Sequence, residues 1–269
     1  MSARFFDGID WAAPWFDTVR PVAQQVLAAA DWRSELNRLA QTMQLQNHVG
    51  LPLHFIAQQD LPEGVAYEAH ISATGGVPTR ENLHDFFNAL VWLTFPLIKR
   101  QLNALQAAQI AALGIGKSRG AARDAATIFD ENAAVLVLAD GALGDALLAA
   151  LRAHRWQEAF MAQAEVFGQA AELWSFGHAL MEKLVTPYKA ICAHSWVLRV
   201  DAGYFQQAPD VRLGIIDSAV AAQLAQHALT TAAYMPLPVA GIPGWVAQQD
   251  AAFYADAAVF RPAKRIECA

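Results

Sequence analysis

The longest apolar stretch of the chain, residues 86–98, sets the first limit on what the protein can be. It reads FFNALVWLTFPLI, and Asn88 and Pro96 interrupt it well before the roughly 20 residues that a membrane-spanning helix needs. Because 55% of all residues are hydrophobic and only 16% are charged, the chain can bury a core and has too little charge for general disorder. We therefore expect a soluble protein with a buried helix in this stretch and no membrane partner.

The length of 269 residues suits one large domain, and we expect a single domain over residues 1–269. Acidic and glycine residues, Asp7 and Gly8, stand where a secretory signal would place its apolar segment. Two cysteines, Cys192 and Cys268, suit free thiols in a reducing compartment. These features predict a cytoplasmic protein. The net charge of −6 opposes attraction to a phosphate backbone, so nucleic acid is not an expected partner.

Hydrophobic periodicity predicts a mixed α+β fold with a helical N-terminal third. The predicted elements of the first half are helices to residue 48, a hairpin over 51–57 and 65–72, a break at 75–78, a helix from a Thr79 N-cap to about 95, a helix over 97–113 and a connection over 114–132. Those of the second half are a strand over 133–139, a helix over 142–153, a mostly helical 156–167, a strand over 171–176, a short helix from Gly177 to near Pro187 and a strand over 190–200. The hairpin favours α+β over a doubly wound sheet.

The last segment, residues 235–269, is too rich in Pro, Gly and aromatic residues for regular elements. Its large aromatic side chains are Trp245, Phe253, Tyr254 and Phe260. Their burial at about 1.5–3 kcal/mol each would offset the entropy of ordering the segment. We expect an irregular tail that packs on the body of the protein.

The helix predicted after Thr79 has two unlike faces. One face is apolar, and the other carries Glu81, His84, Asp85, Asn88 and Trp92. A face exposed to solvent usually carries Lys, Glu or Gln, which form helices well, whereas His, Asp and Asn are poorer helix formers that can converge on a ligand or metal. Both interpretations, a solvated face and a ligand-binding face, remain open from the sequence.

Two further polar strings are candidates for the same kind of site. Asp130-Glu131-Asn132 precedes the strand predicted at 133–139, with Arg123 and Asp124 upstream. Carboxylates in such a loop can bind a metal or act as acid and base, although Asp and Asn are also common turn residues. His178 and Glu182 are four residues apart on a predicted helix, with Lys183 adjacent, which fits a metal pair or an ordinary contact within the helix.

We expect these three strings to converge on one pocket for a small molecule or a metal, with hydrolysis as the reaction class. The candidate catalytic residues are His84, Asp85, Asn88, Arg123, Asp130, Glu131, His178 and Lys183. The candidate metal ligands are His84, Asp85, His178 and Glu182. In a metal-dependent hydrolase Glu131 would be the general base, and Lys183 or Arg123 would stabilise developing negative charge. A divalent metal is the one cofactor considered.

Two alternatives stay open. In the first, the protein is a noncatalytic partner-binding or ligand-sensing domain, and the polar strings form caps and buried hydrogen-bond networks. In the second, His70-Ile71, Gly75-Gly76 and Asn82-Leu83 form an HNH-like nuclease site, in which a histidine of a β-hairpin faces a helix. Ala69 stands where that family has an acidic residue.

Five strings resemble one known family. They are PTRENLHDFFNALVWLTFPLIKRQLN, RGAARDAATIFDEN, FGHALMEKL with Pro-Tyr-Lys following, PLPVAGIPGW and FYADAAVFRP. Together they resemble the bacterial family catalogued as domain of unknown function 3025, in order, over residues 78–262. The resemblance implies a single bacterial domain and no activity that can be carried over. The family strings contain Thr79, Arg80, Asn82, His84, Asp85, Asn88, Arg123, Asp124, Asp130, Glu131, Asn132, His178, Glu182 and Lys183. Ala133-Ala134 follows the acidic string where the family pattern suggests a glycine.

Overall fold

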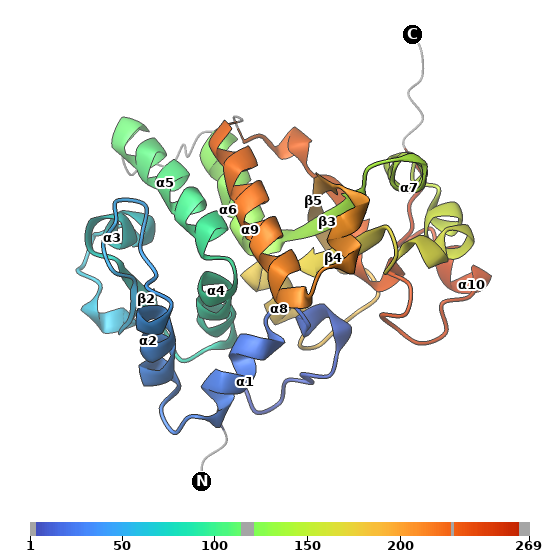
Figure 1. Ribbon diagram of the computed structural model, residues 1–269. Helices are drawn as coiled ribbons and strands as arrows, with labels where there is room; N and C mark the ends of the chain where they lie inside the picture. Colours follow the sequence, from blue (N-terminus) through green and yellow to red (C-terminus); the bar gives the residue numbers. More distant parts are fainter. Residues whose placement is uncertain (1–3, 114–120, 227–228, 264–269) are drawn as a thin grey trace.

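The computed structural model describes residues 4–113, 121–226 and 229–263, which form a mixture of helices and two small sheets (Figure 1). The α-helices are α1 (Arg20–Ala28), α2 (Trp32–Thr42), α3 (Tyr67–Thr74), α4 (Leu83–Thr94), α5 (Pro96–Leu113), α6 (Ala121–Asn132), α7 (Ala142–Arg152), α8 (His178–Lys183), α9 (Pro209–Gln226) and α10 (Ala251–Tyr254). The strands are β1 (His54–Ala57), β2 (Gly76–Thr79), β3 (Ala133–Ala139), β4 (Ala171–Ser175), β5 (Cys192–Val200) and β6 (Met235–Pro238). The predicted α+β class and helical N-terminal region are confirmed. Within the described residues, none of the helices combines the length and apolarity needed to cross a bilayer.

The larger sheet is built around β3, in the order β4-β3-β5-β6. β3 runs parallel to β5 and antiparallel to β4, and β6 is antiparallel to β5. Every residue of β3 is buried, because its apolar side chains alternate between two hydrophobic clusters. Val135 and Val137 face the cluster that contains residues of α4, α5 and α9, whereas Leu136 and Leu138 face the cluster that contains residues of α7 and the C-terminal segment.

The predicted hairpin over 51–57 and 65–72 is wrong. Residues Tyr67–Thr74 form α3, and β1 pairs in parallel with β2, so that His54 lies opposite Gly76. The alternation at 65–72 misled the prediction because Ile71 is the one fully buried residue of α3 and most of the others are half-buried, which leaves little helical periodicity to detect. Gly75 ends α3 at φ +76°, and a Cβ there would lie 2.2 Å from the carbonyl oxygen of Pro52. The break predicted at 75–78 is therefore a glycine turn that leads directly into β2.

The start of α4 also differs from the prediction. Thr79 ends β2, and the N-cap is Asn82, whose Oδ1 accepts a hydrogen bond from the backbone N–H of Asp85 at 2.8 Å. Asn82 competes well for this position because its short side chain reaches the free N–H groups of the first turn. The second predicted helix corresponds to α5, which begins at Pro96.

The connection predicted over 114–132 is helical where the structure describes it. Residues 114–120 lie outside the described residues, and α6 occupies Ala121–Asn132. Asp130, Glu131 and Asn132 therefore end a helix and do not form a loop. The strand and helix predicted next, at 133–139 and 142–153, correspond to β3 and α7.

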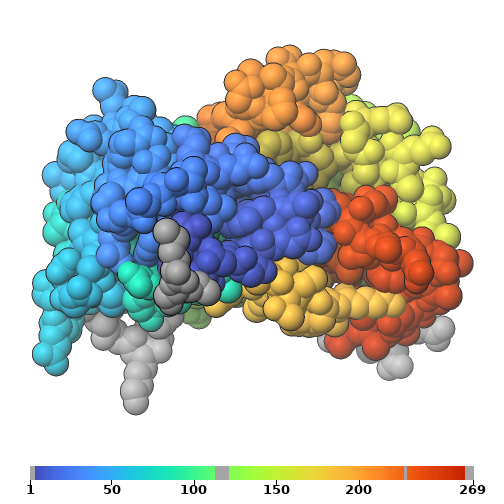
Figure 2. Space-filling view, turned by 90° about the horizontal axis from the view of Figure 1, so that it is seen from below, coloured from blue at the N-terminus to red at the C-terminus, as the bar shows by residue number. Residues whose placement is uncertain are grey.

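The C-terminal segment contains more regular structure than predicted. Residues 235–238 form the edge strand β6, and α10 follows, whereas residues 264–269 lie outside the described part. Tyr254 and Phe260 are buried and Trp245 and Phe253 are partly buried, so the expected packing is present. The segment also meets the N-terminus, with the rings of Trp15 and Trp245 6.4 Å apart, and Figure 2 shows these blue and red regions side by side.

Candidate functional site

A polar cavity of about 510 Å³ lies among α3, α4, α5, α6 and α8. Its lining residues are Gln58, Leu61, Ala66, Tyr67, Glu68, Arg80, His84, Asp85, Asn88, Gln106, Arg123, Thr127, Asp130, Glu131 and His178. The volume is within the range of small-ligand pockets, about 300–1,000 Å³. The structure thus brings together members of all three polar strings.

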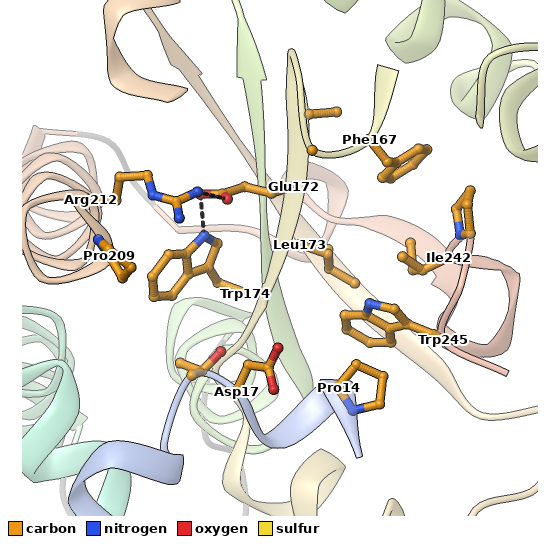
Figure 3. Close-up of a pocket in the computed structure, with 14 residues that line it drawn as sticks. Pro14, Asp17, Phe167, Glu172, Leu173, Trp174, Pro209, Arg212, Ile242 and Trp245 are labelled. Carbon is orange, nitrogen blue, oxygen red and sulfur yellow. Dashed lines mark hydrogen bonds and ion pairs between the residues drawn. The ribbon is translucent and has the colours of Figure 1, made fainter. Parts of the chain in front are cut away.

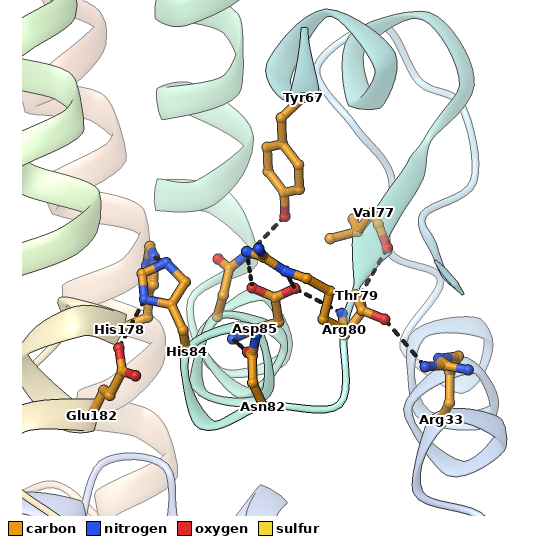
Figure 4. Close-up of polar contacts among 11 residues, drawn as sticks. Arg33, Tyr67, Val77, Thr79, Arg80, Asn82, His84, Asp85, His178 and Glu182 are labelled. Carbon is orange, nitrogen blue, oxygen red and sulfur yellow. Dashed lines mark hydrogen bonds and ion pairs between the residues drawn. The ribbon is translucent and has the colours of Figure 1, made fainter. Parts of the chain in front are cut away.

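Hydrogen bonds in the first turn of α4 hold the polar face of this helix in place next to α8. Asp85 is buried, and its Oδ2 accepts hydrogen bonds from the backbone N–H and the Nε of Arg80, at 2.7 and 2.9 Å. Nη2 of Arg80 bonds the other carboxylate oxygen at 3.1 Å (Figure 4). Both oxygens of Asp85 are therefore engaged by Arg80. Together with the Asn82 cap, this fork holds His84 in position next to α8.

His84 and His178 face each other across the contact between α4 and α8 (Figure 4). Their Nε2 atoms are 3.1 Å apart, and the ring planes are at 80°. Nδ1 of His84 lies 2.9 Å from Oε2 of Glu182, whereas Nδ1 of His178 lies 3.8 Å from Oδ2 of Asp130. Each ring thus has a carboxylate near the nitrogen that faces away from the other histidine.

Gly177 makes the close approach of α8 possible. A Cβ on this residue would lie 2.4 Å from the carbonyl oxygen of Glu131. The backbone N–H of Gly177 also donates a hydrogen bond to the carbonyl oxygen of Ala133 at 2.7 Å. The N-terminus of α8, which carries His178, is consequently held against the C-terminal end of α6, which carries Asp130.

The hydrogen-bond partners assign the protons of the two rings. Since Glu182 is an acceptor, His84 carries a proton on Nδ1. If His84 is protonated on Nδ1 alone, His178 donates from Nε2 in this contact, and its Nδ1 then has no hydrogen-bond partner among the described residues. Burial lowers the pKa of His178 to about 4, and the nearby Asp130 carboxylate opposes that shift only in part. His178 is therefore neutral at pH 7.

A buried ion pair between Lys99 and Asp130 lies next to the two histidines. Nζ of Lys99 bonds Oδ1 of Asp130 and, at 2.8 Å, Oδ1 of Asn88, and Nδ2 of Asn88 donates to the hydroxyl of Tyr67 at 2.8 Å. Burial alone would raise the pKa of Asp130, but the ammonium of Lys99, with help from His178, outweighs it and lowers that pKa below its usual value. Asp130 is therefore a charged carboxylate held at the base of the cavity.

The remaining predicted residues differ in their positions. Glu131 and Arg123 line the cavity, with Glu131 beside Asp130 at the end of α6. Lys183 is exposed, bonds Oδ1 of Asn132 at 2.9 Å and is not among the lining residues. Glu182 lies behind His84 and contacts the cavity only through that ring.

The four candidate metal ligands do not form one cluster. Among the described residues, no group of three or more His, Cys, Asp or Glu side chains is placed to hold a metal ion. Asp85 is engaged by Arg80 and Glu182 by Nδ1 of His84, so the two facing Nε2 atoms are the remaining donors.

Sequence reasoning missed several residues of the cavity. These are Gln58, Tyr67, Glu68, Lys99 behind the wall, Gln106 and Thr127. Tyr67 and Glu68 were assigned to a strand of the incorrect hairpin. A usable signal existed for Lys99, because it directly follows the apolar stretch 86–98 and a lone lysine in a buried helix requires a partner.

The geometry also bears on the noncatalytic domain and on the HNH-like nuclease. A purely structural role would leave His84 and Asn88 bonded to backbone in the core, and an open catalytic site would leave them unpaired in the cavity. Neither is observed, because other side chains hold both residues at the cavity wall. His70 lies on α3, so the hairpin on which the HNH comparison depends does not exist at this position.

A second cavity, of about 500 Å³, lies beside the edge strand β4 (Figure 3). Its walls include Trp174, Trp245 and Arg212. Glu172 is its most buried carboxylate, and it already accepts hydrogen bonds from Trp174, Tyr204 and Arg212. None of the candidate residues from the sequence lines this cavity.

Comparison with known proteins gave one match. A family model described as "Protein of unknown function (DUF3025)" matches residues 53–264, a range that contains every residue lining the polar cavity. Neither the curated proteins nor the solved structures contain a match.

Proposed function

Because the chain belongs to the DUF3025 family, whose description assigns no function, we propose from the cavity itself that the protein binds a small polar molecule and catalyses acid–base chemistry on it, with hydrolysis as the reaction class. The observation that carries this proposal is the contact of 3.1 Å between Nε2 of His84 and Nε2 of His178 at the wall of the polar cavity. Two imidazole rings in such a contact share one proton between their Nε2 atoms, which is the property that a proton-transfer pair requires.

The two histidines would have different roles. Glu182 holds a proton of His84 on Nδ1, so Nε2 of His84 would accept the proton of an attacking water that displaces the His178 contact there. His178, kept neutral by burial, would donate a hydrogen bond from Nε2 to the developing negative charge. The proton accepted by His84 then passes to the leaving group, which completes hydrolysis. Glu131, also on the wall, is the alternative general base.

A substrate screen tests the proposal. Wild-type protein would be assayed against p-nitrophenyl acetate, p-nitrophenyl phosphate and a panel of natural esters, amides and phosphoesters, together with His84→Gln and His178→Gln. The matched control is His194→Gln, because His194 is exposed on β5 and does not line the cavity. We expect at least about 100-fold lower kcat/KM for each cavity variant, the usual contribution of a general acid or base, and an unchanged value for the control.

Two results would contradict catalysis by this pair. Turnover that survives both cavity substitutions would place the chemistry elsewhere. Saturable binding of a small molecule without turnover of any related compound would favour the noncatalytic ligand-sensing alternative.

A metal-dependent version of the same chemistry is the second candidate, and one distance favours it. Two imidazole nitrogens bound to one tetrahedral zinc at about 2.0–2.1 Å lie roughly 3.3 Å apart, close to the observed 3.1 Å. A cation would also let both rings carry their protons on Nδ1, each toward a carboxylate, as metal-bound histidines usually do. With two protein ligands, water or substrate would complete the coordination.

Metal analysis of protein purified without a His tag, followed by titration with zinc and manganese, tests this candidate. Metal well below stoichiometric amounts together with no affinity for either ion would end it.

We also propose a cytoplasmic location. The free thiol of Cys192 supports a reducing compartment, since no disulfide involves this residue. Fractionation of the native host, with immunodetection of the protein in each fraction, would test it.

A further inference from the structure

Arg123 lies at the cavity wall with part of its guanidinium group buried. It lies in the first turn of α6 on the cavity wall, and its Nε is buried without a hydrogen-bond partner among the described residues. Within the same residues its guanidinium has no ion pair. A buried N–H without an acceptor costs about 1–3 kcal/mol, so an acceptor that enters from the cavity would remove an existing penalty.

The other cations of the site are already compensated. Lys99 bonds Asp130 and Asn88, and Arg80 forms the fork with Asp85. Among the described residues around the cavity, Arg123 is thus the cation without a counter-ion in contact.

Glu68 is the carboxyl group that most directly competes for Arg123. The two interact electrostatically, yet Oε2 of Glu68 accepts its hydrogen bond from Asn103 at 2.7 Å. Burial raises the pKa of Glu68, which disfavours its charged form, and Lys99 and Arg123 oppose this shift. Among the described residues Glu68 makes no hydrogen bond to Arg123, so the Nε of Arg123 stays available to an external anion.

A second uncommitted donor lines the same cavity. Gln106 on α5 is buried, and its amide has no hydrogen-bond partner within the part of the chain that the structure describes. An arginine fork and an amide together fit the planar or tetrahedral oxygens of a carboxylate or a phosphate.

The position of Arg123 on α6 sets the length of the ligand. Arg123 and Asp130 both line the cavity, and seven residues of helix separate them by about 10.5 Å along the axis. Asp130 marks the end of the cavity where the His84–His178 pair lies. This backbone separation gives the scale of a molecule that would reach from Arg123 to the histidines, on the order of 10 Å.

We propose that Arg123 binds the terminal anionic group of the substrate, and that the substrate is an elongated small molecule with a carboxylate or phosphate at one end and the bond to be cleaved near His84 and His178. This inference rests on the proposed function for the position of the reacting bond. The binding of the anionic group to Arg123 is independent of that function.

The test is a binding measurement with simple anions. Inorganic phosphate and glutarate would be titrated into the full chain by calorimetry at constant ionic strength set with NaCl. The Nε–H signals of the arginines would be followed by NMR in parallel. The variants are Arg123→Gln and, as the matched control, Arg100→Gln, because Arg100 is exposed on α5 and does not line the cavity. Thermal melting of each variant checks that the fold is retained.

We expect saturable binding of at least one anion, a shift of one arginine Nε–H signal that Arg123→Gln removes, and a Kd at least tenfold weaker in that variant. Arg100→Gln should leave the Kd unchanged. Binding of phosphate alone assigns the substrate to the phosphate esters, and binding of glutarate alone assigns it to the carboxylates. Absence of binding by both anions, or equal affinity in Arg123→Gln, would overturn the inference. His178→Gln should keep the anion affinity, so failure of catalysis by the histidines is distinguishable from failure of anion binding.

Discussion

At the scale of single residues, the least expected feature is a charged pair beneath the cavity. The side chain of Lys99 is 4% exposed and that of Asp130 is 11% exposed. Such pairs contribute little net stability relative to apolar residues, but they are expensive to break. Lys99 also bonds Asn88, and Asp130 is the carboxylate that lies near His178. The pair therefore links the stability of the fold to the geometry of the site.

Lys99→Met should destabilise the protein by about 3–5 kcal/mol, because it leaves the Asp130 carboxylate buried without a counter-charge. Urea denaturation at pH 7 measures this change. Lys183→Met is the control, since Lys183 is exposed, and should stay within about 0.5 kcal/mol. A loss below about 1 kcal/mol in Lys99→Met would show that the pair is not buried as described.

At the scale of elements, the cavity depends on how closely α6, α8 and α4 approach one another. Gly177 permits one of these contacts without unusual backbone geometry, since its φ is −59°. The requirement at this residue is therefore purely steric.

Gly177→Ala should push α8 away from α6 and separate the two histidines. We expect a loss of about 1–3 kcal/mol, as for other overpacked contacts, and lower turnover at saturating substrate. Gly214→Ala on α9 is the matched control, because a Cβ there meets nothing within 4 Å. This control should gain about 0.5–1 kcal/mol from helix propensity. Equal stability of the two variants would contradict the close approach.

Asp217 connects α9 to the start of α5. Its carboxylate accepts hydrogen bonds from the backbone N–H groups of Leu97 and Ile98 at 3.0 and 2.9 Å, and burial raises its pKa to about 6. The folded state therefore holds this proton more tightly than the unfolded chain, with its ordinary value of 3.8, and the free energy of unfolding falls as the pH rises through 6.

Asp217→Asn should remove this part of the pH dependence. Between pH 5 and 7 the free energy of unfolding should fall by about 1 kcal/mol more in the wild type than in the variant. Urea denaturation of both proteins at the two pH values measures the difference. Parallel curves would contradict the raised pKa.

The elements that could be predicted are those whose pattern of buried residues shows within a few neighbouring positions of the sequence. β3 was found because a strand buried on both faces is a continuous apolar run, and the polar face of α4 was found because His84 and Asn88 are one turn apart. α3 was missed because a helix with one fully buried residue has no clear period. Of the cavity, the sequence supplied His84, Asp130 and His178 from their chemistry. Lys99 carried a signal as a charge next to a buried stretch, but its partners, like the role of Gln106, arise from helix packing that spacing does not encode.

At the scale of the whole molecule, β3 joins the two hydrophobic clusters and the C-terminal segment closes one of them. β6 pairs with β5, the hydroxyl of Tyr254 donates to the carbonyl oxygen of Gly241 at 3.0 Å, and Lys189 forms an ion pair with Asp256 at 2.8 Å. A single domain over residues 1–269 stays a prediction, which the next experiment tests.

A chain that ends at Tyr234 should be much less stable than the full chain. Removal of the segment exposes the surface on which Tyr254 and Phe260 are buried and leaves β5 without its edge partner. Even if unfolded-state compactness halves the area-based estimate, several kcal/mol are lost, a large part of the roughly 5–15 kcal/mol of a typical domain. Thermal denaturation measures the effect. An unchanged melting temperature would show that the segment is an appendage and that the domain boundary lies before it.

In the function we propose, His84 and His178 act as one proton-transfer unit in the polar cavity. The most direct measurement is a double-mutant cycle of kcat/KM for wild type, His84→Gln, His178→Gln and the double variant, on the first substrate found. Residues that act as a unit are strongly non-additive, so the double variant should be no slower than the slower single variant, within about threefold. Losses that multiply, or single variants that keep wild-type kcat/KM, would contradict the claim.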